Sequence, residues 1–306
     1  MAEDLEIRRL NETRWLRTRR AQERSLLHEQ SIQDHEINEL LALIDFGFLN
    51  RACQMEQQKS RTSLVDNQHT DQSSIFLMAN DSSGNRQSER HSLIGLIELY
   101  PDNVRQRAEE YQLQLRTWVL FVVVHELVHN YSHTDIQGAK AFFEANSLSG
   151  MLKEMLLFWQ KRTAKQMNVQ SGYKRQDTTL LTSNDSFSSD RVQQHTTYEN
   201  FDEGVTDKMA LEILTEYAKL HPDFLTQTEL DKLIFVLSEE KEASGHGKAI
   251  KLVDGVIADF SLRFGVSTDV VWEAIKNEKM GILSEDDNEI KQVLAQLPKN
   301  EQIEIL

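Results

Sequence analysis

The sequence contains few of the residues that cross-link or interrupt a chain. It has 1 Cys, 3 Pro and 12 Gly among 306 residues. With Cys53 as the single cysteine, no disulfide can form within the chain, which excludes a disulfide-stapled fold and favours a reducing compartment. The scarcity of Pro and Gly predicts long elements with few sharp turns, and helices suit that best.

Positive charge and long apolar runs are scarce as well. The formal net charge is −15, which argues against a surface that binds nucleic acid or anionic membranes. The longest apolar run, residues 118–124, is far shorter than the roughly 18 residues that cross a bilayer. The first 20 residues also lack the apolar core of a secretory signal. We therefore expect a soluble, cytoplasmic protein without nucleic-acid or membrane partners; nothing in the sequence indicates its oligomeric state.

The distribution of apolar residues predicts three regions. Leucines and isoleucines at helical spacing indicate a helical N-terminal region over residues 1–57 and a helical C-terminal subdomain over residues 201–306. In the central region, residues 58–200, two short apolar runs at 73–80 and 92–100 flank a polar segment, which is typical of a β-hairpin. The expected class is α+β and mostly helical, with a small antiparallel or mixed sheet packed on a central helix.

The central helix is predicted to cover residues 104–131. Its second half is apolar on all sides, so we expect it to pass through the core. Helix is expected to continue over residues 136–168. The Ser- and Thr-rich segment 168–200 is predicted to be an irregular loop, and the glycines near residue 245 are expected to form a turn between helices.

A possible metal site lies at the end of the central helix, in the sequence H-E-x-x-H formed by His125, Glu126 and His129. Residues four apart return to the same face of a helix, so the two histidines can bind one ion together. Glu126 would then lie beside the ion, where it can take a proton from a bound water. Because a catalytic zinc usually takes three protein ligands, a third ligand is needed.

One candidate for the third ligand is close in sequence. The metzincin pattern H-E-x-x-H-x-x-G-x-x-H/D would place the ligand at Asp135. That pattern has a glycine where the chain turns out of the helix, and this sequence has Ser132 at that position. Asp135 is therefore the second choice.

The first choice is Glu203, in the segment D-E-G-V-T-D of residues 202–207. Together with the upstream H-E-x-x-H, this segment resembles the gluzincin metallopeptidases, the thermolysin-like clan, whose second motif is E-x-x-x-D or a close variant. The resemblance implies a zincin-like core, Glu203 as the third zinc ligand and Asp207 as a carboxylate that hydrogen-bonds a ligand histidine. It covers residues 90–215, and the long segment between the two motifs is expected to be an insertion over or beside the cleft.

The resemblance also implies a function. A zinc peptidase of this type would act on a peptide or protein substrate, with Zn²⁺ as cofactor and Glu126 as general base. The apolar run at 92–100 would be an unpaired edge strand that binds the substrate main chain. The oxyanion would be stabilised by one of four residues, between which the sequence does not distinguish: Tyr131, Tyr173, His195 and Tyr198.

A second hypothesis comes from a different class of protein. The chain would keep the zincin fold without catalysis and act as an interaction module. Its metal would then be structural or its cleft occluded, and the C-terminal helices would dock a partner. Hydrolytic activity that depends on Glu126 separates the two hypotheses.

Overall fold

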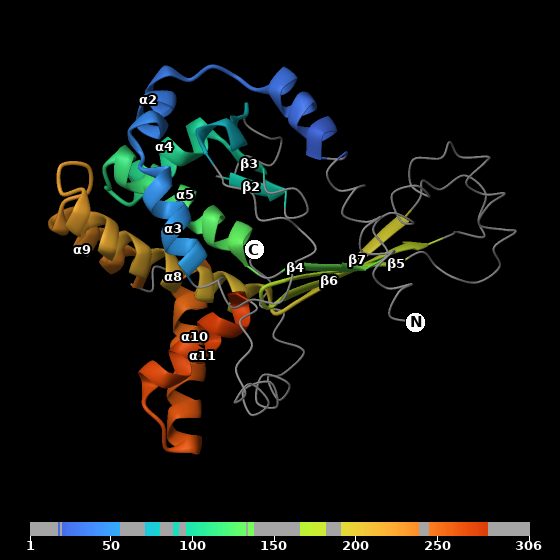
Figure 1. Ribbon diagram of the computed structural model, residues 1–306, viewed down its shortest axis with the longest axis vertical. Helices are drawn as coiled ribbons and strands as arrows, with labels where there is room; N and C mark the ends of the chain where they lie inside the picture. The colour runs from blue at the N-terminus through green and yellow to red at the C-terminus, as the bar shows by residue number, and fades with distance from the viewer. Residues whose placement is uncertain are drawn as a thin grey trace, which may run out of the picture.

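The computed structural model describes residues 18, 20–55, 71–79, 88–91, 96–132, 134–137, 166–181, 191–238 and 245–280, and all structural statements concern these residues (Figure 1). A helix covers residues 20–30, and a 3₁₀ turn, η1, covers Gln72–Ser74. The other helices are α2 (His35–Leu43), α3 (Phe46–Met55), α4 (Pro101–Glu110), α5 (Leu115–Tyr131), α8 (Glu199–Leu220), α9 (Gln227–Ser238), α10 (Gly245–Phe264) and α11 (Thr268–Met280). The prediction of a mostly helical protein is confirmed.

The described strands form two sheets. The first has the order β1-β3-β2 and the second the order β4-β5-β6-β7. Their bounds are β1 (Ile75–Leu77), β2 (Ser88–His91), β3 (Leu96–Leu99), β4 (Thr134–Gln137), β5 (Gln166–Ser171), β6 (Lys174–Leu181) and β7 (Arg191–Thr197).

The small sheet differs from the predicted hairpin. The two apolar runs form β1 and β3, which pair in parallel, with Ile75 opposite Ile97. The antiparallel partner of β3 is β2, which lies in the segment that we interpreted as a polar loop. β3 is therefore the central strand, and the prediction that the run at 92–100 is an unpaired edge is wrong. The local sequence of β2, Ser-Glu-Arg-His, has no apolar alternation that would mark it as a strand.

The predicted long helix is two helices, because the chain turns at Gln112. This residue has φ of 53°, in the left-handed region. The amide of Leu113 donates to the carbonyl of Ala108, and the amide of Gln112 donates to that of Glu109, the two bonds of a Schellman C-cap. Glycine usually occupies the left-handed position of this cap, so glutamine there gave no signal in the sequence.

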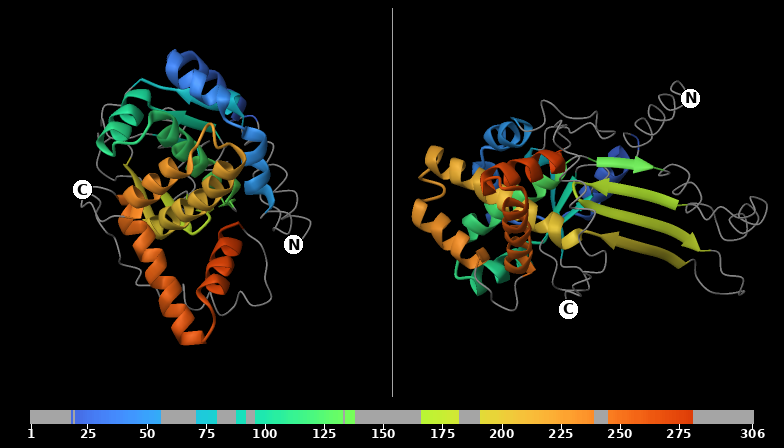
Figure 2. Two further views of the ribbon diagram at one scale, coloured as in Figure 1. Left: turned by 90° about the vertical axis from the view of Figure 1, so that its left-hand side faces the viewer. Right: turned by 90° about the horizontal axis from the view of Figure 1, so that it is seen from below.

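The second sheet corrects two predictions about residues 136–200. β4 and β5 occupy both ends of the segment expected to be helical; its middle, residues 138–165, lies outside the described residues. β5, β6 and β7 occupy most of the segment expected to be an irregular loop, and all pairings in this sheet are antiparallel. Thr and Val favour strands even where the composition is polar. The sheet projects from the helical body as an arm (Figures 1 and 2).

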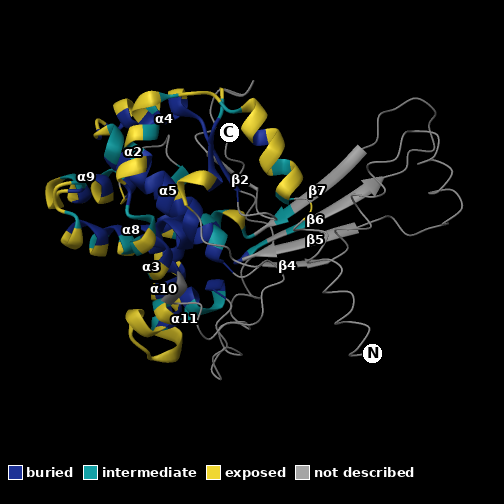
Figure 3. Ribbon diagram, turned by 45° about the horizontal axis from the view of Figure 1, so that its top comes forward, coloured by how far each residue is buried: buried dark blue, intermediate teal, exposed yellow. Residues whose placement is uncertain are grey.

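The core is organised around α5. Every residue from Thr117 to His129 is buried, as expected for a helix that is apolar on all sides (Figure 3). One continuous apolar cluster joins α5 to residues from α2 through α11 and includes Cys53. Cys53 is a buried core residue, and burial raises the pKa of its thiol to about 12. Among the described residues, no helix combines the length and apolar character of a membrane-spanning segment.

Helices α8 and α10 approach each other closely at Gly204. A Cβ atom at this position would lie 2.2 Å from the carbonyl oxygen of Ala249, a backbone atom that cannot move without moving α10. Asp207 lies one turn after Gly204, and His246 one turn before Ala249. The absence of a side chain at residue 204 therefore allows these two side chains to meet.

Gly204→Ala should separate the two helices. We expect the free energy of unfolding to fall by about 1–3 kcal/mol, as for other overpacked sites. The matched control is Gly255→Ala, since Gly255 lies on α10 with nothing within 4 Å of the added Cβ. The control should be neutral or stabilise by up to about 1 kcal/mol through helix propensity. Urea unfolding of the metal-free protein measures both, and equal stability of the two variants would contradict the close approach.

Candidate metal centre

Helices α5 and α8 bring the sequence-predicted ligands together. His125 and His129 lie one turn apart near the end of α5, and Glu203 lies in the second turn of α8. α8 begins directly after β7, at Tyr198, whose φ of 61° turns the chain sharply from the strand into the helix. α5 and α8 pack against each other within the core. The turn at Tyr198 and this packing set where Glu203 meets the two histidines.

The three side chains meet at one point. The two Nε2 atoms of His125 and His129 are 3.1 Å apart. The Oε2 atom of Glu203 is 3.2 Å from Nε2 of His125 and 3.3 Å from Nε2 of His129. Both histidines are 8% exposed, so the two imidazole nitrogens face each other with little access to water. Such a pair is costly unless a proton or a cation lies between the nitrogens.

This triangle has the size of a metal site. An ion held at about 2.0–2.1 Å by tetrahedral ligands requires ligand atoms about 3.3–3.4 Å apart, close to the three observed distances. Two imidazoles and one carboxylate are a usual donor set for divalent transition metals. Within the described part of the chain, this is the one group of three or more His, Cys, Asp or Glu residues that is compatible with a metal site.

A hydrogen-bonded chain fixes the orientation of His125. Its Nδ1 atom is 2.8 Å from Oδ1 of Asp207, and the other oxygen of Asp207 is 2.8 Å from Nδ1 of His246 on α10. Asp207 is fully buried. A carboxylate in this position favours the tautomer with the proton on Nδ1, which leaves the Nε2 lone pair directed at the other two side chains of the triangle and available to a metal ion. The His246 ring also packs at right angles to the His125 ring, with centroids 6.0 Å apart.

His129 has two oxygen atoms near its outer nitrogen. Its Nδ1 atom is 3.5 Å from Oδ2 of Asp202 and 3.5 Å from Oγ1 of Thr206. The Thr206 hydroxyl donates to the carbonyl of Asp202 at 2.8 Å, so its oxygen can accept a hydrogen bond from the imidazole. Both ligand histidines thus face an aspartate of α8 on the side away from the triangle.

The two histidines differ in proton affinity. Burial lowers the pKa of His125, but the Asp207 and Glu203 carboxylates outweigh burial and raise this pKa well above its ordinary value. Burial lowers the pKa of His129, and the neighbouring His125 and Lys279 charges add to that effect against the opposing attraction of Glu203. One proton on His125 therefore satisfies the pair when no ion is bound, and a metal must displace it.

The carboxylates of the site are anionic at neutral pH. Burial raises the pKa of Glu203, but the charges and hydrogen bonds of His129 and His125 hold it well below its ordinary value. Burial also raises the pKa of Asp207, but the charges and hydrogen bonds of His246 and His125 lower it to about 2, with the charge of His246 having the largest lowering effect. The centre therefore carries fixed negative charge, which favours a cation.

The remaining predicted residues are placed as follows. Glu126 is 6% exposed and follows His125 on α5. Two of the four oxyanion candidates use their hydroxyls elsewhere: Tyr131 donates to Asn50, and Tyr173 donates to the carbonyl of Ile275. His195 lies on β7, with its side chain outside the description, and Tyr198 is half-buried at the start of α8.

The alternative ligand Asp135 lies on β4, opposite Gln170 of β5, and its side chain is outside the described part. The chain leaves α5 at Ser132 in an extended conformation, with φ of −60°. The left-handed turn that a metzincin glycine provides is therefore not made at this position.

Three residues of the site were missed in the sequence. Asp202 lies in the D-E-G-V-T-D segment without a predicted role, and His246 lies in the segment predicted to be a turn between helices, whereas α10 already begins at Gly245. Lys279 lies on α11, fully buried, with its Nζ atom 2.6 Å from Oδ1 of Asp202. The only available signal was a titratable side chain in an amphipathic helix, which is too common to identify a site.

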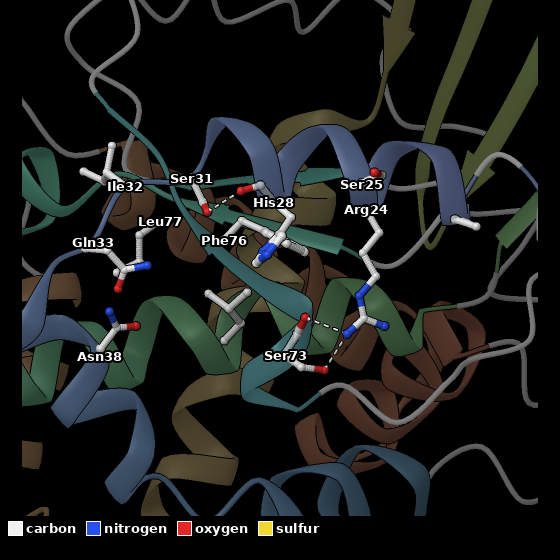
Figure 4. Close-up of a pocket in the computed structure, with 12 residues that line it drawn as sticks. Arg24, Ser25, His28, Ser31, Ile32, Gln33, Asn38, Ser73, Phe76 and Leu77 are labelled. Carbon is white, nitrogen blue, oxygen red and sulfur yellow. Dashed lines mark hydrogen bonds between the residues drawn. The ribbon is translucent and has the colours of Figure 1, made fainter.

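A cavity of about 610 Å³ lies elsewhere, between the helix of residues 20–30 and β1 (Figure 4). Arg24 lines one side of it and donates to the carbonyl and hydroxyl oxygens of Ser73, at 3.2 and 2.9 Å. None of the sequence-predicted site residues lines this cavity. It is therefore separate from the metal centre.

Comparisons with known proteins give no independent assignment. No protein-family model matches the sequence, and neither the curated proteins nor the solved structures include a match.

Metal content tests the ligand set. Glu203→Gln should lose the bound metal, because the neutral amide removes the negative charge that the carboxylate places beside the cation and the two neutral imidazoles. The matched control is Glu199→Gln, four residues earlier on α8, whose carboxylate binds Lys174 instead. Mass spectrometry of the dialysed proteins measures the metal-to-protein ratio. Loss of metal in Asp135→Asn with retention in Glu203→Gln would show that the ligand set is wrong.

Proposed function

We propose that this chain is a zinc-dependent peptidase of the gluzincin type, with His125, His129 and Glu203 as the zinc ligands. The observation that carries the proposal is the triangle formed by two buried histidine nitrogens and one half-buried carboxylate oxygen, with sides of 3.1, 3.2 and 3.3 Å. The ion supported by this donor set and size is Zn²⁺, which is usually bound by three protein ligands in catalytic sites. The proposed zincin-like core is supported by the same pair of helices, α5 and α8.

The chemistry of the site divides between the metal and Glu126. Zinc, when bound, polarises a carbonyl oxygen and lowers the pKa of a bound water from 15.7 to about 7. The Glu126 carboxylate accepts a proton from the water as its oxygen bonds to the scissile carbonyl carbon, and then returns this proton to the amide nitrogen, so that the C–N bond breaks and the amine leaves. Glu126 is suited to this task by its place directly beside His125 and by its burial.

The other residues hold the geometry of the reaction. Asp207 keeps Nδ1 of His125 protonated and thereby leaves Nε2 free for the metal. The substrate main chain would pair with β2, the outer strand of the small sheet, which contacts α5. This replaces the strand at 92–100, whose two edges are both paired.

Glu126→Gln tests the proposal. We expect peptide hydrolysis to fall by about 10²- to 10⁴-fold because the amide cannot accept the proton, while the zinc content stays unchanged. Cleavage of a quenched fluorescent peptide library measures the activity. The matched control is Glu216→Gln, an exposed residue of α8 paired with Lys219, which should leave the activity unaltered.

Two results would contradict the proposal. A wild-type protein that binds zinc but cleaves no peptide of the library would support the interaction module instead. Equal cleavage by wild type and Glu126→Gln would show that hydrolysis, where present, does not use this carboxylate.

A further inference from the structure

A fully buried lysine lies behind the metal centre. Lys279 of α11 and Asp202 of α8 are both 0% exposed, and Nζ of Lys279 is 2.6 Å from Oδ1 of Asp202. Burying two charges removes their hydration, so an ion pair of this kind contributes little to stability compared with apolar residues of the same size. The Lys279–Asp202 ion pair lies next to His129, which suggests a role in the metal centre and not in stability.

The two carboxylate oxygens of Asp202 have different environments. Oδ1 accepts hydrogen bonds from Nζ of Lys279 and, at 2.8 Å, from the amide of Tyr173. Oδ2 is buried and has no hydrogen-bond partner within the described part of the chain. Its near neighbour is Nδ1 of His129, at 3.5 Å. Oδ1 is thus held by two hydrogen bonds, while Oδ2 is directed at the imidazole of His129.

The turn between β5 and β6 covers this ion pair. Gly172 has φ of 56°, and a Cβ atom there would lie 2.5 Å from Oδ1 of Asp202 and 2.9 Å from Nζ of Lys279. The next residue, Tyr173, also donates its hydroxyl to the carbonyl of Ile275 on α11, at 2.9 Å. The base of the β4–β7 sheet is therefore fixed to both α8 and α11 at the point where Asp202 meets Lys279.

We propose that Lys279, held by the turn at Gly172 and Tyr173, is a positioning residue for the metal ligand His129 and acts through Asp202. Lys279 fixes the rotation of the carboxylate, so that Oδ2 accepts the Nδ1 proton of His129 and the Nε2 lone pair is directed at the ion. The inference depends on the metal centre of the proposed function, though not on peptidase activity. It makes α11 and the projecting sheet necessary for an ordered site.

Cobalt binding to the full-length, metal-free protein tests the inference, because Co²⁺ reports both affinity and ligand geometry through its visible absorption. In Lys279→Met we expect the affinity for Co²⁺ to fall by about 10- to 100-fold, with altered absorption bands. The matched control is Lys276→Met, one turn earlier on α11, whose lysine pairs with Glu212 and Glu273 away from the metal. The control should keep the affinity and spectrum of the wild type.

A second variant covers the case in which Lys279→Met does not fold, because that change leaves Asp202 as an unpaired buried charge. The double variant Asp202→Asn, Lys279→Met removes both charges, and its thermal unfolding without metal shows whether it is folded. We expect it to fold and to bind Co²⁺ as weakly as the single variant. Wild-type affinity and spectrum in the double variant would overturn the inference.

Two further outcomes are decisive. If Thr206→Val weakens Co²⁺ binding and the double variant does not, the hydroxyl holds His129 and Lys279 has no part in the site. If the wild type binds neither Co²⁺ nor Zn²⁺, the metal centre is absent and the proposed function is overturned together with the inference. If the wild type binds Co²⁺ and none of the variants changes the affinity, the inference is overturned and the proposed function is not.

Discussion

Two buried imidazole nitrogens and one carboxylate oxygen approach one another closely at the junction of α5 and α8. At separations of 3.1–3.3 Å, the nitrogens of His125 and His129 and the oxygen of Glu203 need a shared proton or cation. The surrounding structure makes this approach achievable. α5 is buried on all sides, and the chain turns from β7 into α8 at Tyr198. The site is therefore formed by the core itself.

The outer residues of the site show why the C-terminal helices belong to it. Asp207 contacts both His125 and His246, which lies on α10. Asp202 lies near His129 and pairs with Lys279, which lies on α11. In both cases an aspartate of α8 lies between a histidine of the candidate metal centre and a basic side chain. Such partners set the tautomer and basicity of a ligand imidazole, and their loss typically lowers metal affinity.

The sequence predicted the part of the site that depends on local spacing. His125 and His129 share a helix face because they are four residues apart, and Glu203 and Asp207 stand out because a short motif contains both. His246 and Lys279 come from helices with no local pattern, and only tertiary packing brings them to the site. The fold shows the same limit. The mostly helical class followed from periodicity, whereas β2 and the β4–β7 sheet are polar strands, and the turn at Gln112 uses a residue that rarely takes that conformation.

Anomalous diffraction at the zinc absorption edge, from crystals of the protein purified with zinc, tests the central claim most directly. We expect one strong peak within about 2.0–2.2 Å of Nε2 of His125, Nε2 of His129 and a carboxylate oxygen of Glu203. A peak bound by the two histidines and Asp135 would contradict the ligand set. Zinc located only at sites away from His125 and His129 would contradict the metal centre itself.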